Sequence, residues 1–163
     1  MSNEWRIGQG YDIHAVVEER PLVLGGVEVR QSFGLGGHTD GDVVLHAVID
    51  ALFGAAGLPD IGEHFPSTDS ALKGVSSRRL LRECMQKIEK DRWTVSNLDL
   101  TIVAEKPKLS AHKIRIAESL ADMLGIDHQR VSAKAKTNEG FDAVGRGEAI
   151  ACHVVLTLKR GTR

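Results

Sequence analysis

Cysteine, proline and aromatic residues are scarce in this chain of 163 residues. It contains two cysteines and four prolines, and aromatic side chains make up 4% of the sequence. Cys84 and Cys152 are too few and too isolated for a disulfide framework or an all-cysteine zinc site. We therefore expect a reduced, cytoplasmic environment and a core built from aliphatic side chains.

The chain also lacks an excess of either charge. It has 21 Lys and Arg against 22 Asp and Glu, which gives a net charge of -1 at pH 7. A nucleic-acid-binding protein ordinarily has a basic balance or a basic stripe that pairs with phosphates. No apolar run approaches the roughly 18 residues of a membrane span, and residues 1–15 lack the profile of a signal peptide. These absences argue against nucleic-acid partners and against a membrane.

Strand and helix patterns follow one another without a repeat or a linker between them, so we expect one domain over residues 1–163. Hydrophobic periodicity predicts helices over residues 39–56, 76–93 and 110–125. It predicts strands over residues 5–15, 21–29 (two pieces around a Gly-Gly turn), 98–105, 131–137 and 148–160. This order lacks the regular alternation of a doubly wound sheet, and it indicates a mixed α/β or α+β fold.

Helix ends and strand faces give further expectations. Thr39 followed by Asp42 resembles a capping box, Ser110 is expected to cap the third helix, and Gly125 to end it. Residues 148–158 are apolar on nearly both faces, which predicts a strand buried on both sides.

Asp12 and His14 form an Asp-x-His pair on the first predicted strand, where residues two apart share a face. His46 lies early in the first predicted helix, with Asp42 and Asp50 one turn to either side. If strand and helix meet, one oxygen and two nitrogens could hold a zinc-like ion and leave a fourth position for substrate. The alternative is that both histidines are polar residues satisfied within the fold.

Lysines concentrate in two other segments, KPK (106–108) and KAKTNE (134–139). With a threonine and a glutamate beside them, Lys106, Lys108, Lys134 and Lys136 suit a polyphosphate and a bridging divalent ion. Solvated lysines on edge strands are the alternative. The long acidic loop 58–74 could bind sugar hydroxyls or be a solvated turn, and Arg146 with Glu148 is typical of a structural ion pair.

Five segments resemble, in the same order and with matching separations, the signature segments of the 2-C-methyl-D-erythritol 2,4-cyclodiphosphate synthase family. They are GQGYDIHA, GGHTDGDVVLHAVIDALFGAAGLPDIGEHFP, VAEKPKL, KAKTNEG and GRGEAIA, and the resemblance covers residues 6–158. It implies that 4-diphosphocytidyl-2-C-methyl-D-erythritol 2-phosphate is cyclised with loss of CMP, in the non-mevalonate route to isoprenoid precursors. It also implies an α+β sandwich, with a mixed sheet covered by helices on one face and sheets packed around the three-fold axis of a homotrimer.

The resemblance implies a role for each matching residue. Asp12, His14 and His46 would bind Zn2+, Glu139 would hold Mg2+ or Mn2+ between the substrate phosphates, and His38 and Thr137 would stabilise the transition state. Asp12, His14 and His38 would also contact substrate, together with positions along the rest of the chain: Thr39, Asp60, Ile61, Gly62, Phe65, Pro66, Ser67, Thr68, Asp69, Ala104, Lys108, Leu109, Ser110, Lys136, Thr137, Asn138, Glu139, Ala143 and Arg146.

Some positions depart from the family pattern. Ser67 replaces a common Asp in the loop after the first helix, which weakens the expected contact with substrate hydroxyls. Lys136 and Asn138 replace frequent threonines, and Lys136 adds positive charge beside the phosphates. Ala143 replaces an aromatic residue, so only a backbone contact is expected there.

Two other functions stay open from the sequence. A metal-dependent nucleotide phosphohydrolase would use Asp12, His14 and His46 to activate water. A non-enzymatic trimer would bind isoprenoid diphosphates through Arg146 in its central channel. In that case, replacing His46 with Ala would leave ligand binding and function intact. The resemblance to the synthase family implies that a synthase could also bind such a ligand there, in addition to its activity.

Overall fold

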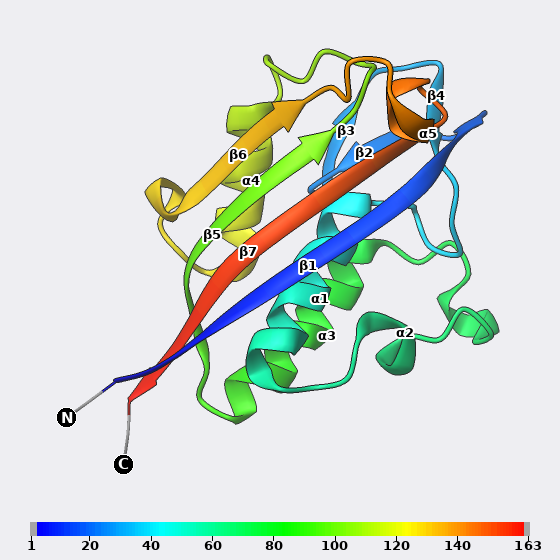
Figure 1. The fold of residues 1–163 in the computed structure, drawn as a ribbon. Coiled ribbons are helices and arrows are strands. Elements are labelled where there is room, and N and C mark those ends of the chain that lie inside the picture. Colours follow the sequence, from blue (N-terminus) through cyan, green and yellow to red (C-terminus); the bar gives the residue numbers. More distant parts are fainter. Residues whose placement is uncertain (1–2, 162–163) are drawn as a thin grey trace.

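A five-stranded mixed sheet forms the centre of the computed structural model, which describes residues 3–161 (Figure 1). Its strands lie in the order β4-β1-β7-β5-β6, and only β5 and β6 are parallel. Their bounds are β4 Phe33–Leu35, β1 Asn3–Glu18, β7 Ala149–Gly161, β5 Thr94–Val103 and β6 Val131–Lys136. A separate hairpin pairs β2 (Leu22–Leu24) with β3 (Val27–Val29) around the expected Gly-Gly turn.

The long helices cover one face of the sheet, as expected (Figure 1). They are α1 Val43–Ala56, α3 Ser77–Lys90 and α4 Lys113–Leu124. Short helices lie in the connections: α2 Ile61–His64, α5 Asp142–Gly145, and the 3-10 turns Ser70–Leu72 and His128–Arg130. None of the helices in the described part of the chain is long and apolar enough to cross a membrane.

The other face of the sheet is open in the single chain. Large apolar side chains are exposed on it, among them Trp5, Ile7, Tyr11, Ile13 and Val155. In the single chain, residues 148–158 are buried on both sides only near Ala149 and Ala151, and His153 and Val155 are exposed. The burial expected there would have to come from neighbouring subunits.

Two glycines on β1 determine how closely α1 lies on the sheet. A Cβ atom at Gly8 would sit 1.9 Å from the backbone oxygen of Ala51, and one at Gly10 would sit 1.9 Å from that of Ala47. Only glycine permits this approach at these positions. The next two residues on the same face are Asp12 and His14, which therefore meet the first turns of α1.

The starts of two helices differ from expectation. Helix α1 begins at Val43, and its N-cap is Asp42, whose side chain accepts the N–H groups of Val44 and Leu45. The prediction of a capping box at Thr39 is wrong, because Gly41 has a left-handed φ of 76° that interrupts the helical backbone between Thr39 and Val43. Helix α4 begins at Lys113, and no side chain caps it.

Ser110 is therefore not the N-cap of α4. The preceding turn is closed by the backbone oxygen of Leu109, which accepts the N–H groups of His112 and Lys113. Gly125 ends α4 in a left-handed conformation, as predicted.

Candidate functional site

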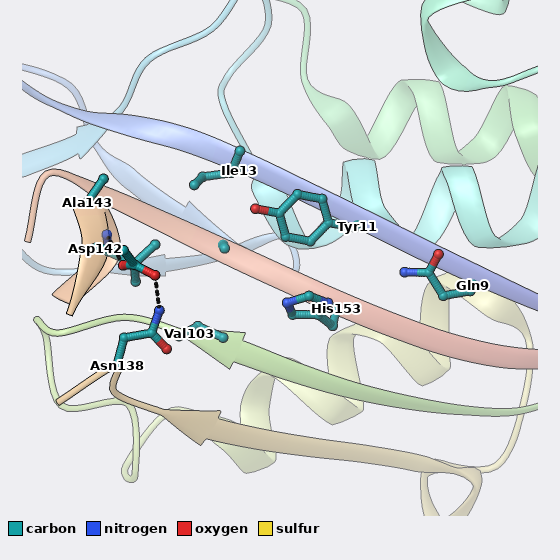
Figure 2. Close-up of a pocket in the computed structure, with 10 residues that line it drawn as sticks. Gln9, Tyr11, Ile13, Val103, Asn138, Asp142, Ala143 and His153 are labelled. Carbon is teal, nitrogen blue, oxygen red and sulfur yellow. Dashed lines mark hydrogen bonds between the residues drawn. The ribbon is translucent and has the colours of Figure 1, made fainter.

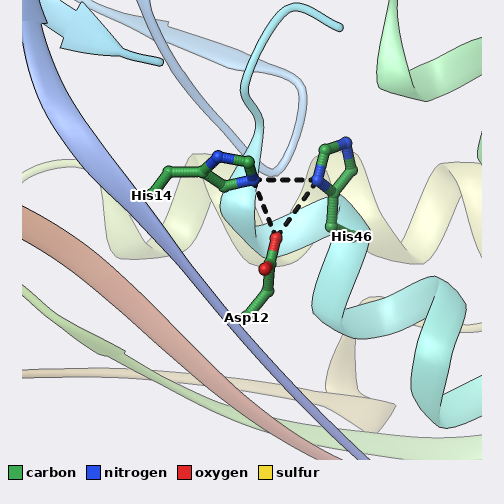
Figure 3. A group of neighbouring side chains, drawn as sticks. All are labelled: Asp12, His14 and His46. Carbon is green, nitrogen blue, oxygen red and sulfur yellow. Dashed lines mark hydrogen bonds and ion pairs between the residues drawn. The ribbon is translucent and has the colours of Figure 1, made fainter. Parts of the chain in front are cut away.

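Asp12, His14 and His46 meet where β1 passes the N-terminal end of α1, and Figure 3 shows their side chains converging. Oδ2 of Asp12 lies 2.8 Å from Nε2 of His14 and 3.1 Å from Nδ1 of His46. The two imidazole nitrogens are 3.0 Å apart. The three ligand atoms that the sequence singled out are thus brought together by the fold, and no other metal-type cluster occurs among residues 3–161.

The close arrangement of these three side chains changes the pKa values of Asp12 and His14. Burial alone would raise the pKa of Asp12, but hydrogen bonds from His14 and His46 outweigh burial and lower the pKa to about 2. Burial also opposes the charged form of His14, while Asp12 more than compensates and raises the pKa of His14. The carboxylate is therefore ionised and available to a cation at neutral pH.

The three other acids near α1 have separate roles. Asp42 is fully buried and accepts backbone N–H groups from Gly25 and Gly26 at 2.9 and 2.6 Å, in addition to capping α1. Burial raises the pKa of Asp42 to about 6. Asp50 accepts the N–H of Ile61 and so fixes the start of the loop after α1. Asp40 contacts Ser77 at the start of α3.

A hollow of about 200 Å³ adjoins His14 and His46, and we call it the histidine hollow. His38, Thr39 and residues of the loop after α1 line it, the latter being Ile61, Gly62, Phe65 and Ser67. Nε2 of His38 is 2.9 Å from the backbone oxygen of Asp69. Asp60 caps α2, and Pro66, Thr68 and Asp69 are exposed on the same loop.

Two of the four lysines predicted to form a cluster, Lys108 and Lys136, line a hollow at the adjacent ends of β5 and β6. This second hollow of about 240 Å³, the lysine hollow, is lined by Ala104, Lys108, Leu109, Ser110, Lys136 and Thr137. The hydroxyl of Thr137 donates to Glu139 at 3.1 Å. Lys134 instead pairs with Asp99 on β5 and lies outside the hollow.

A third hollow, of about 540 Å³, lies on the open face of the sheet and is shown in Figure 2. Tyr11, Ile13 and His153 line it together with Asn138 and Ala143. The resemblance implied functional roles for Asn138 and Ala143, but none for Tyr11 or His153. Arg146 and Glu148 form the expected ion pair, with two contacts of 3.0 Å, on the surface.

Ser77 is the polar residue near the cluster that sequence reasoning missed. It reads as the first residue of an ordinary amphipathic helix, yet it is fully buried and its hydroxyl lies 2.9 Å from His46. A serine directly after the N-cap Ser76 gives no sequence signal of a functional role, because only the packing of α3 against the cluster turns its side chain toward His46.

Comparisons with known proteins agree with this geometry. Residues 5–159 match the model of the YgbB family. A curated 2-C-methyl-D-erythritol 2,4-cyclodiphosphate synthase from Bordetella avium is 51% identical over 160 residues, which cover 98% of this chain and 99% of that protein. The protein of the same name from Thiobacillus denitrificans is 49% identical over 158 residues, covering 97% of this chain and 99% of that one.

Solved structures resemble the fold over nearly its whole length. IspF from Plasmodium falciparum, solved as a CDP complex, has a TM-score of 0.85 at 34% identity, covering 99% of this chain and all (100%) of that one. The bifunctional IspDF from Campylobacter jejuni has a TM-score of 0.94 at 38% identity, covering 98% of this chain and 43% of that chain.

Proposed function

Because the chain belongs to the YgbB family, we propose that it catalyses the reaction for which its relatives are named, the formation of 2-C-methyl-D-erythritol 2,4-cyclodiphosphate. The substrate is 4-diphosphocytidyl-2-C-methyl-D-erythritol 2-phosphate, in the non-mevalonate route to isoprenoid precursors. An oxygen of the 2-phosphate attacks the β-phosphorus, the bond from that phosphorus to the α-phosphate oxygen breaks, and CMP leaves. The observation that carries the proposal is the convergence of Asp12, His14 and His46 beside the histidine hollow.

The cluster fits a divalent ion such as Zn2+. Ligand atoms that bind zinc at about 2.0–2.2 Å in a tetrahedral site lie roughly 3.3 Å from one another. The three atom pairs here are 2.8, 3.0 and 3.1 Å apart, close to that spacing. When bound, such an ion would neutralise diphosphate charge as a Lewis acid. Glu139, exposed beside Thr137, is proposed to hold Mg2+ or Mn2+ between the substrate phosphates.

The protein's own groups orient the substrate and donate hydrogen bonds. The nucleophile is already an anionic phosphate oxygen, so no strong general base is needed, and positioning with charge neutralisation suffices. His38 and Thr137 would donate to phosphate oxygens as the transition state forms, and Lys136 would neutralise charge. Asp60 and the loop 65–69 would contact the methylerythritol part, and residues 104–110 the cytosine.

We place the working site between subunits of a homotrimer, each subunit a single synthase domain over residues 1–163 in the cytoplasm. Two observations support this. The histidine and lysine hollows are separate within one chain. The open face of the sheet exposes several large apolar side chains, which is typical of an interface. A neighbour's lysine hollow would complete the site, and Arg146 would face a central channel that could take an isoprenoid diphosphate.

Phosphorus NMR of the chain with the cytidyl diphosphate substrate, zinc and magnesium tests the activity. We expect two coupled cyclic-diphosphate resonances and stoichiometric CMP. His46→Ala should reduce turnover by about a hundredfold or more, because it removes a metal ligand. His128→Ala is the matched control, since His128 is exposed on a surface turn and should leave turnover unchanged.

Other products would contradict the proposal in defined ways. Inorganic phosphate or an open-chain product would indicate the metal-dependent phosphohydrolase. Binding of isoprenoid diphosphate without turnover, unaffected by His46→Ala, would indicate the non-enzymatic binding protein.

A further inference from the structure

On the side of its ring away from Asp12 and His14, His46 contacts side chains that the proposed reaction does not use. Its Nδ1 faces Asp12 and His14, at 3.1 and 3.0 Å. Its other nitrogen, Nε2, lies 2.9 Å from the hydroxyl of Ser77. That hydroxyl makes a short hydrogen bond to Asp40. A chain of hydrogen bonds therefore runs from the metal-type cluster through Ser77 to Asp40.

The direction of each hydrogen bond follows from the chemistry of the groups. An ionised carboxylate can only accept, so the Ser77 hydroxyl donates to Asp40. The Ser77 oxygen can then use a lone pair to accept the Nε2–H of His46. With a cation among the three ligand atoms, the hydrogen bond from Nδ1 of His46 to Asp12 would be absent. A neutral imidazole protonated at Nε2 would then direct its Nδ1 lone pair at that cation.

We infer that Asp40, acting through Ser77, is a positioning residue that holds His46 as the Nε2–H tautomer, with its Nδ1 lone pair directed at a divalent cation. The inference rests on the proposed metal-dependent function and adds two residues to it. Neither would touch the ion or the substrate. Hydrogen-bond partners behind a metal-binding histidine typically change metal affinity by about 10–100-fold.

The local packing supports a dedicated arrangement. Ser77 is fully buried, so its hydroxyl has no bulk solvent to bond. Thr39 also approaches Nε2 of His46, at 3.1 Å, and its hydroxyl oxygen accepts the N–H of Gly41 and lies 3.4 Å from the Ser77 hydroxyl. The shorter contact to Ser77 continues to a carboxylate, which makes Ser77 the stronger acceptor for the imidazole proton.

Asp40 also has a structural task that can be separated from this one. Its second oxygen accepts the backbone N–H of Ser77 at 3.0 Å, at the start of α3. Ser77→Ala keeps that backbone contact and removes only the hydroxyl. Ser76→Ala is the matched control, because Ser76 is the exposed N-cap of α3 and its side chain accepts the N–H of Arg78 without reaching His46.

Zinc affinity of the full chain, measured by competition with a chromophoric chelator, tests the inference. Ser77→Ala should bind zinc about 10–100-fold more weakly than wild type. Ser76→Ala should unfold at a lower temperature yet bind zinc within about twofold of wild type, because only a helix cap is lost. Equal zinc affinity in Ser77→Ala and wild type, or equal losses in both variants, would overturn the inference.

A second measurement needs no variant and decides the matter if Ser77→Ala fails to fold. Long-range 1H–15N NMR of the zinc-loaded wild type should show His46 protonated at Nε2 and coordinated through Nδ1. Coordination through Nε2 would overturn the inference. A wild-type chain that takes up no zinc would overturn the metal site and this inference together, whereas wild-type affinity in Ser77→Ala overturns only the role of Ser77 and Asp40.

Discussion

The histidine hollow and the lysine hollow differ in how firmly their side chains are held. In the first, Asp12, His14 and His46 are largely buried, with 28%, 16% and 11% of their side-chain surface exposed, and each is fixed by contacts between β1 and α1. In the second, Lys136 and Thr137 are exposed, and the hydroxyl of Thr137 contacts Glu139 two residues away. The first region is closely packed within the single chain, and the second is exposed.

The difference matches what each region would bind. An ion needs ligands held at fixed positions, so the cluster benefits from being assembled before the ion arrives. A polyphosphate chain can be bound by long, solvated ammonium groups that adjust to it. Under the proposed trimer, the open hollow receives its missing wall from a neighbouring subunit.

Subunit mixing gives the largest expected effect and tests whether the two hollows work together across an interface. His46→Ala damages one hollow and Thr137→Ala the other, so each variant alone should lose about a hundredfold in turnover. When subunits of the two variants are mixed in equal amounts, about a quarter of the interfaces in a random trimer combine two intact halves. Turnover should therefore recover to roughly that fraction.

The control for subunit mixing combines two variants of the same hollow. His46→Ala mixed with Asp12→Ala should stay inactive, because every site then lacks a metal ligand. If His46→Ala mixed with Thr137→Ala also stays inactive while mixed trimers form, each site lies within one chain, and the interface proposal is wrong.

Gly10→Ala tests whether the close packing of α1 on β1 holds the histidine hollow in place. The new Cβ would lie 1.9 Å from the backbone oxygen of Ala47. Helix α1 must then move away from β1 and carry His46 with it, so we expect a loss of about 2–3 kcal/mol in the free energy of unfolding and weaker zinc binding. Chemical denaturation and chelator competition measure the two effects.

Gly54→Ala is the control on the same helix. A Cβ there comes no closer than 4.0 Å to the backbone of Gln9, and alanine favours a helix over glycine by up to about 1 kcal/mol. This variant should be slightly stabilised and bind zinc normally. Destabilisation of both variants by the same amount would mean that the close approach at Gly10 has no special importance.

Sequence patterns predicted the parts of the fold that depend on local periodicity. The predicted strands and three long helices all occur, and period-2 alternation correctly placed Asp12 and His14 on one face. The proximity of His46 to that pair follows from the glycines at positions 8 and 10, which are visible in the sequence as close-approach residues, although their partner on α1 is not.

Features that depend on packing between distant segments were not predictable. Helix α1 is capped by Asp42, and the carboxylate of Asp42 also accepts the N–H groups of Gly25 and Gly26 from a remote hairpin, a contact that no local pattern signals. The inward direction of Ser77 depends on how α3 meets the cluster. The apolar pattern of β7 predicted burial on both sides, but it does not say whether the cover beside Val155, which is exposed in the single chain, comes from the same chain or from a neighbouring subunit.

The smallest expected effect is a difference in activity between substitutions of two lysines on one face of β6. Lys136 lines the lysine hollow, whereas Lys134 is paired with Asp99 outside it. Lys136→Ala should lower kcat/KM by about tenfold, since a charged hydrogen bond to phosphate contributes roughly 1.5 kcal/mol, and the loss should shrink as salt is raised. Lys134→Ala should change kcat/KM by less than about twofold, because an exposed ion pair contributes little. Equal losses from both substitutions would mean that the lysines act only through general surface charge, and that the open hollow does not recognise the phosphates.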